Sequence, residues 1–226
     1  MLLNVLTNEY IYGIITVLLQ VVQFGGNMSK IIDYILNMIP YMVIALPIIF
    51  LTRMIIVHVR GLSKRTTFLH ETGIHLFFLY LVGLASQTII PALEIRVHGI
   101  GIVNQGLKGE INLIPGKVFV DTWNECINNH YWMYFIINFL GNICIFIPIG
   151  FLICLLWHKQ SLFKTAMIGF GISLFIEICQ LPQARSTDID DLWLNTSGAI
   201  IGFFIYKLSE KILKKTYDRF KLRRNA

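Results

Sequence analysis

The sequence of 226 residues has few charged side chains, and this shortage limits the classes of protein to which it can belong. Asp, Glu, Lys and Arg make up 14% of the chain, whereas soluble domains average about 25%. Hydrophobic residues make up 55%, which leaves too little polar surface to cover a water-soluble core. The composition therefore excludes an ordinary soluble domain and predicts a polytopic membrane protein.

Cysteine is also scarce, and its spacing argues against disulfide and zinc chemistry. The chain has four cysteines and no Cys-x-x-Cys pair: Cys126, Cys144, Cys154 and Cys179. Neither a disulfide framework nor a zinc site is expected. His70 and His75 lie five residues apart, whereas the helical zinc-protease motif needs histidines four apart. We expect no metal and no cofactor.

Long apolar segments recur along the chain, and each matches the roughly 20 residues that a membrane-spanning helix needs. Five spans are predicted: Tyr34–Thr52, Ile74–Ala92, Tyr131–Trp157, Leu162–Gln180 and Ile189–Leu208. In Met1–Phe24, polar residues recur at spacings of three and four, which is typical of a helix with one polar stripe. We favour a sixth span there over the alternative, an interfacial helix.

The predicted fold is an all-α polytopic membrane bundle of five or six transmembrane helices with a structured extracellular loop. Its expected parts are an N-terminal helix at 1–30, two spans at 31–92, the loop at 93–130, a three-helix core at 131–208 and a basic tail at 209–226. Within the loop, Glu94–His98 alternates with period two and Gly99-Ile-Gly101 follows, which predicts a short hairpin. Apolar residues in Ile111–Val120 are expected to dip toward the membrane.

The net charge of +6 comes from basic residues that flank the apolar segments. Three basic groups lie between the first two spans, between the third and fourth, and after the last. If the five spans alternate, these three groups fall on one side, which the positive-inside rule assigns to the cytoplasm. The predicted location is the bacterial cytoplasmic membrane, with the basic loops and the C-terminus inside. The bilayer is the expected partner, and nucleic acid is not.

Polar residues gather around the turn between the last two predicted spans. Glu177 and Gln180 end one span, Arg185 lies on the turn, and Asp188, Asp191 and Asn195 share a face of the next. Gly198 and Gly202 continue this face, which we expect to meet the preceding span. Since charge at the edge of hydrocarbon is costly, these polar residues predict a functional polar pocket that opens outward. Asn138 and Asn142, four apart in the third span, are predicted to line it as well.

Structural explanations compete with this hypothesis. Thr187 or Asp188 can cap the last helix, and acids in its first turn suit its positive end. Glu177 and Arg185 can form a buried ion pair, and Asn138 and Asn142 can join helices. Glu177 and Asn195 favour the pocket, because capping explains neither a carboxylate near a helix C-terminus nor an amide about two turns inside.

Three motifs resemble the VanZ-like family of bacterial membrane proteins. They are Asn112-Leu-Ile-Pro115, the helix from Asn138 through Asn142, Phe146 and Pro148 to Gly150, and the closing series Glu177, Gln180, Arg185, Asp188, Asp190, Asp191, Asn195, Gly198 and Gly202. The resemblance covers about Asn112–Tyr206. Gly116 departs from it, because an aromatic residue is expected after Pro115.

The resemblance implies a part in low-level resistance to teicoplanin, a lipoglycopeptide that targets lipid-linked cell-wall precursors. We expect the pocket to bind an envelope headgroup or an amphiphile such as a lipid-linked cell-wall precursor or a lipoglycopeptide. The alternatives are an enzyme that acts on a lipid-linked cell-wall substrate at the outer leaflet, with the acids as metal ligands or as acid and base, and a proton-coupled transporter. Catalytic residues are not assigned.

Overall fold

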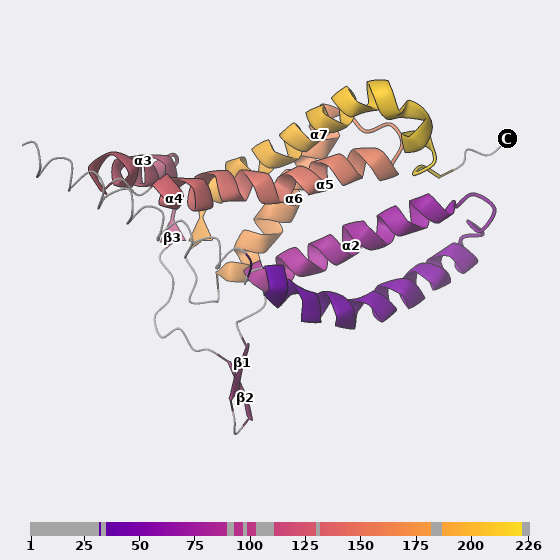
Figure 1. The fold of residues 1–226 in the computed structure, drawn as a ribbon, viewed down its shortest axis with the longest axis horizontal. Coiled ribbons are helices and arrows are strands. Elements are labelled where there is room, and N and C mark those ends of the chain that lie inside the picture. Colours follow the sequence, from indigo (N-terminus) through magenta and orange to yellow (C-terminus); the bar gives the residue numbers. More distant parts are fainter. Residues whose placement is uncertain are drawn as a thin grey trace, which may run out of the picture. The chain divides into compact units, whose positions relative to one another are not determined.

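The computed structural model describes residues 32, 35–89, 93–96, 99–102, 111–129, 132–181 and 187–222 of the protein (Figure 1). The chain divides into two compact units, Met1–Asn37 and Met38–Ala226, and everything reported below concerns contacts within the second. In chain order the elements are helix Ile35–Val59, α2 (Phe68–Thr88), β1 (Leu93–Arg96), β2 (Gly99–Ile102), β3 (Ile111–Asn112), α3 (Lys117–Asn129), α4 (Trp132–Phe135), the π-helix η1 (Ile136–Leu140), α5 (Gly141–Leu156), α6 (Leu162–Gln180), β4 (Thr187–Asp188) and α7 (Ile189–Asp218). The predicted all-α class is confirmed, because the strands hold only two to four residues each.

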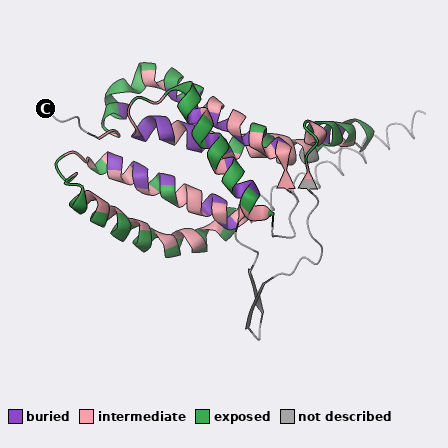
Figure 2. Cartoon of the chain, turned by 180° about the vertical axis from the view of Figure 1, so that it is seen from behind, coloured by how far each residue is buried: buried purple, intermediate pink, exposed green. Residues whose placement is uncertain are grey.

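Four of the described helices are long and apolar enough to cross a membrane: Ile35–Val59, Phe68–Thr88, Asn138–Leu156 and Leu162–Gln180. The last of these has the predicted bounds of the fourth span. Most residues of helix Ile35–Val59 are exposed (Figure 2), and the exposed residues of these four helices include many large apolar ones, which suit contact with hydrocarbon rather than water. α7 is not among the four, so a span at Ile189–Leu208 stays a prediction. The helix expected at 1–30 lies outside the described residues.

Helices α5 and α7 approach each other closely because glycine lies where they meet. Gly150 of α5 rests on the backbone of Ala199 in α7, and Gly198 of α7 rests on the carbonyl of Ile143 in α5. A Cβ on Gly202 would lie 2.7 Å from the backbone nitrogen of Phe151. Small residues permit such backbone contact between membrane helices. The close approach brings the first turns of α5 and α7 together.

Helix α6 packs on a neighbouring face of α7. A Cβ on Gly169 would lie 2.6 Å from the Cβ of Ala199, so Ala199 separates α6 from α5. The sequence predicted that Gly198 and Gly202 would face α6, and this was wrong, since both face α5. The physical reason is that small residues at consecutive positions of a helix cover two faces, about 100° apart, and therefore accept two neighbours.

Helix α2 completes the core of the bundle from the side of α5. Ile74, Phe77 and Leu84 of α2 join Phe146, Ile149, Ile153 and Leu156 of α5 and Ile176 of α6 in one buried cluster. The Tyr80 hydroxyl donates a 2.6 Å hydrogen bond to the Ile145 carbonyl. At the other end of α2, Arg53 holds Glu71 through both carboxylate oxygens, at 2.7 and 2.9 Å. α2 is therefore connected to α5 through Tyr80 and to helix Ile35–Val59 through Glu71.

The C-terminal part of α7 extends beyond the predicted boundary at residue 208. The helix continues to Asp218, with non-helical dihedral angles at Leu213, and the chain then turns back toward α2. His70 Nδ1 donates a 2.6 Å hydrogen bond to the Phe220 carbonyl, and His158 Nε2 donates one of 2.7 Å to the Leu222 carbonyl. The first part of the predicted basic tail is therefore helical and docked.

The predicted hairpin is present as β1 paired antiparallel with β2, with Leu93 opposite Ile102. The second half of the same segment forms α3, which the sequence predicted only as apolar residues near the membrane. Gly116 precedes α3 with a φ of 81°, a conformation that glycine adopts without strain. This turn places the N-terminus of α3 beside the start of α7.

Candidate functional site

The centre of the candidate site is a short parallel pairing between β3 and β4. Asn112 pairs with Asp188 in register. The Asn112 amide donates hydrogen bonds of 3.0 and 2.9 Å to the two carboxylate oxygens of Asp188. The side-chain Oδ1 of Asn112 accepts a hydrogen bond from the backbone N–H of Ile114 at 3.2 Å. One asparagine therefore anchors the segment before α3 to the segment before α7.

Asp188 caps α7 and also connects it to α6. Its Oδ1 accepts the backbone N–H of Asp190 at 2.9 Å, which is the N-cap arrangement. Its own backbone N–H donates to Glu177 Oε2 at 3.2 Å. Capping, the structural alternative for Asp188, is thus present. Glu177 is 5% exposed, so its carboxylate is buried between α6 and α7 and does not point into lipid.

Asp190 is the most buried of the four acids and was not among the predicted site residues. Its Oδ1 accepts the backbone N–H of Gly116 at 2.6 Å and the indole N–H of Trp193 at 2.8 Å. Its Oδ2 accepts the backbone N–H of Val118 at 2.8 Å. A side chain of α7 therefore satisfies the N-terminus of α3. The sequence signals for it were its place in the closing series of the VanZ-like resemblance and the Asn112–Pro115 motif, and neither indicates the contact between the two segments.

Asn142 and Asp191 join α5 to α7 across the bundle. The Asn142 amide donates a 2.5 Å hydrogen bond to Asp191 Oδ1 and one of 3.2 Å to the Asn138 carbonyl. Asn138 lies in the π-helical segment that precedes α5, and such segments often mark functional sites. Asn142 therefore lies beside an acid of α7, and Asn138 contributes its backbone carbonyl to this contact.

Asn195 and Gln180 lie near the acids but bind other groups. Asn195 donates a 2.9 Å hydrogen bond to Ser173 Oγ, which in turn donates to the Asp191 carbonyl at 3.3 Å. The Asn195 Oδ1 atom is buried without a partner. Gln180 donates to the Thr88 carbonyl at 3.1 Å and so ties α6 to α2. Arg185 lies outside the described residues.

The electrostatic character of the site is that of concentrated negative charge. Glu177, Asp188 and Asp190 all lie within electrostatic range of Asp191. Among the described residues, no Lys or Arg forms an ion pair with these four acids. Both carboxylate oxygens of Asp188 and of Asp190 accept hydrogen bonds from protein groups. Glu177 and Asp191, in contrast, each have one described hydrogen-bond donor. These two carboxylates retain acceptor capacity for a ligand.

The described residues contain no group of three or more His, Cys, Asp or Glu side chains arranged to hold a metal ion. His70 and His75, whose spacing argued against a zinc motif, donate from Nδ1 to the carbonyls of Phe220 and Glu71, each at 2.6 Å. His70 therefore connects α2 to the chain after α7, whereas the hydrogen bond of His75 lies within α2.

An aromatic layer borders the carboxylates. Trp193, which donates to Asp190, meets Phe139 edge-to-face with ring centroids 5.8 Å apart. Phe139 in turn contacts Phe119 of α3 at 5.5 Å, and Phe119 stacks on Trp123 at 5.9 Å. Leu113 and Ile114, which precede α3, are 68% and 64% exposed. The polar site thus adjoins an exposed apolar and aromatic surface.

Comparison with protein-family models gives one match, to VanZ/LLP1, over residues 77–210. The match covers more than half of the chain and extends the resemblance seen in the sequence toward the N-terminus, into α2. It includes every described residue of the site. Comparisons with curated proteins and with solved structures gave no match.

Proposed function

Since the chain belongs to the VanZ/LLP1 family, we propose that this membrane protein binds an amphiphilic envelope component at the carboxylate site and thereby lowers susceptibility to lipoglycopeptide antibiotics such as teicoplanin. The observation that carries the proposal is the pair Glu177 and Asp191. Glu177 is buried and Asp191 is half-buried at the junction of α5, α6 and α7, and each has a single described hydrogen-bond donor. Burying charge at this cost favours a role in ligand binding.

The chemistry of the site indicates what the ligand carries. Carboxylates accept hydrogen bonds from hydroxyl and amine groups, so a headgroup rich in these donors complements Glu177 and Asp191. The unpartnered Oδ1 of Asn195 adds a further acceptor in the same region. Sugar and peptide headgroups of envelope precursors and glycopeptides supply such donors.

The surface beside the carboxylates favours an amphiphile over a purely polar ligand. Leu113, Ile114 and Val120 are more than half exposed and lie on the segment that Asn112 and Asp190 fasten to α7. An apolar tail or aromatic group of the ligand would cover this surface and bury area worth about 25 cal/mol per Å². Arg185, on the turn between α6 and α7, would hold a phosphate or carboxylate of the ligand.

The test compares drug susceptibility in cells that express the protein or its variants. Glu177→Gln and Asp191→Asn retain size but remove the charge, and each is expected to abolish protection against teicoplanin while the protein still accumulates in the membrane. Asp121→Asn removes an exposed carboxylate of α3 outside the site and should leave protection intact. The protein should protect cells less against a lipid-free glycopeptide than against teicoplanin. Full protection in both site variants at normal expression would refute the proposal.

A further inference from the structure

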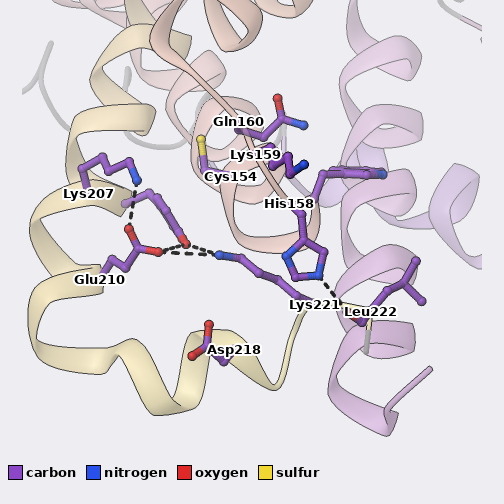
Figure 3. Close-up of a pocket in the computed structure, with 11 residues that line it drawn as sticks. Cys154, His158, Lys159, Gln160, Lys207, Glu210, Asp218, Lys221 and Leu222 are labelled. Carbon is purple, nitrogen blue, oxygen red and sulfur yellow. Dashed lines mark hydrogen bonds and ion pairs between the residues drawn. The ribbon is translucent and has the colours of Figure 1, made fainter. Parts of the chain in front are cut away.

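A second polar site lies at the opposite end of the bundle and takes no part in the carboxylate site. A cavity of about 450 Å³ opens there, between the end of α5, the turn into α6, the far half of α7 and the chain that follows it (Figure 3). Cys154 lines it, twelve residues along α5 from Asn142, a separation of about 18 Å in a helix. Its volume falls within the roughly 300–1,000 Å³ of small-molecule sites.

Three lysines converge on this cavity. Lys159 comes from the turn between α5 and α6, Lys207 from α7, and Lys221 from the chain that folds back. Glu210 and Asp218 are the acids in the lining. With His158 neutral, the lining carries one positive charge more than negative. A ligand with a single negative charge would neutralise it.

A hydrogen-bond network fixes two of the lysines (Figure 3). Lys207 donates to Glu210 Oε2 at 3.0 Å, Lys221 donates to the Tyr206 hydroxyl at 2.7 Å, and Tyr206 donates to Glu210 Oε1 at 2.6 Å. Both ammonium groups also lie over the Tyr206 ring, at 5.6 and 5.3 Å. Two cations therefore share one carboxylate, in positions set before any ligand arrives.

Glu210 stays ionised in this network. Burial opposes its ionisation, but the hydrogen bonds from Tyr206 and Lys207 and the charges of Lys207 and Lys221 outweigh burial and hold its pKa below the ordinary value. It therefore compensates one lysine at neutral pH and leaves the other uncompensated within the network.

Two groups in the lining have no hydrogen-bonding partner among the described residues. Lys159 is exposed, forms no hydrogen bond or ion pair with a described residue, and has a φ of 58°, which is unusual for a residue other than glycine. Gln160 Oε1 is buried without a hydrogen bond. A cation and an amide that both lack partners suit an anion that also carries hydroxyl or amine groups.

We propose that this cavity binds a phosphodiester headgroup of the kind found in anionic phospholipids. Lysine ammonium groups are common phosphate ligands. A phosphodiester carries a single negative charge, which would neutralise the one excess positive charge of the lining. Trp157 lines the same cavity directly after the apolar helix Asn138–Leu156, and tryptophan is enriched where helices leave the membrane. These features favour a lipid over a soluble phosphodiester as the source.

The experiment uses the purified full-length protein in a zwitterionic detergent and measures dissociation constants by thermophoresis. The probes are phosphatidylglycerol, diacylglycerol with the same acyl chains, and glycerophosphoglycerol, the soluble headgroup. Lys159→Gln should weaken phosphatidylglycerol binding about fivefold, the effect of one basic residue at an anionic lipid surface. Lys214→Gln removes the same charge from an exposed position of α7 outside the cavity and should change binding less than twofold.

Gln160→Glu provides a second variant, because it adds a carboxylate to the cavity lining and should also weaken binding. Glycerophosphoglycerol binding with the same dependence on Lys159 would support the phosphodiester site and identify a soluble source. Three results would overturn the proposal: no phosphatidylglycerol binding, equal binding of diacylglycerol, or equal weakening by Lys159→Gln and Lys214→Gln, which would indicate general charge attraction. Equal melting temperatures of the wild type and both lysine variants would show that the comparison concerns folded protein.

Discussion

The Asn142 amide of α5 lies 2.5 Å from the Asp191 carboxylate of α7. The contact is possible because Gly150 and Gly198 allow the two helices to touch along their backbones. The amide of Asn142 in α5 therefore donates to the carboxylate of Asp191 in α7. No described Lys or Arg forms an ion pair with this carboxylate. The same packing that holds the bundle together therefore shapes the candidate site.

Removing this amide should weaken the link between α5 and α7. Asn142→Ala is expected to cost about 1.5–3 kcal/mol, the range for a hydrogen bond to a charged group, as measured by thermal unfolding in detergent. Asn142→Ala combined with Asp191→Asn should cost less than the sum of the two single changes, since both remove the same interaction. Additive losses would show that the contact contributes nothing to stability.

Asp190 should prove to be a structural residue and not a ligand-binding one. Asp190→Ala leaves the N–H groups of Gly116, Val118 and Trp193 without their acceptor, so we expect a loss of at least about 3 kcal/mol of stability and faster proteolysis at α3. Asp121→Ala, on the exposed side of α3, is the control and should be neutral. A wild-type melting temperature for Asp190→Ala would contradict this role.

Replacing Gly198, which lies where α7 touches α5, should lower the stability of the protein. A Cβ on Gly198 would overlap the Ile143 carbonyl and lie 2.9 Å from the Phe146 Cβ. Gly198→Ala should therefore cost at least the roughly 1–3 kcal/mol typical of overpacked cores. Gly171→Ala in α6 is the control, because a Cβ there meets nothing within 4 Å, and it should be neutral or slightly stabilising. Equal behaviour of the two variants in thermal unfolding would argue against the packing.

The orientation predicted from the basic loops can be tested by cysteine labelling. In a variant whose four native cysteines are replaced by serine, Ser186→Cys should react with a membrane-impermeant maleimide on whole cells, because the turn after α6 is expected outside. Lys214→Cys, on the basic side, should react only after lysis. The reverse pattern would invert the topology and move the carboxylate site to the cytoplasmic face.

Local patterns were enough to predict several elements from the sequence. The bounds of α6 and the pairing of β1 with β2 were predicted correctly, because an apolar run between turn signals and a period of two depend on neighbouring residues alone. The capping of α7 by Asp188 was foreseen as the structural alternative for the same reason. That Asn138 and Asn142 share one helix face likewise followed from their spacing of four residues.

Contacts between distant segments could not be predicted in this way. Asp190 was passed over as one more acid in a helix first turn, yet it binds the N-terminus of α3, 72 residues away in the chain at Val118. Gly198 and Gly202 were expected to face α6 but face α5. A face of small residues indicates that another helix can approach closely, but it does not indicate which helix. The position of Lys221 beside Glu210 could not be predicted from the sequence either.

The sequence by itself determined that this is a membrane protein of apolar helices with its acids gathered at one turn, because composition and periodicity act locally along the chain. The tertiary structure alone decided which carboxylates are saturated by backbone donors and which retain acceptor capacity. That distinction arises from the close approach of α5 to α7 and from the folding of the segment before α3 onto β4, and both depend on which helix faces fit together in space.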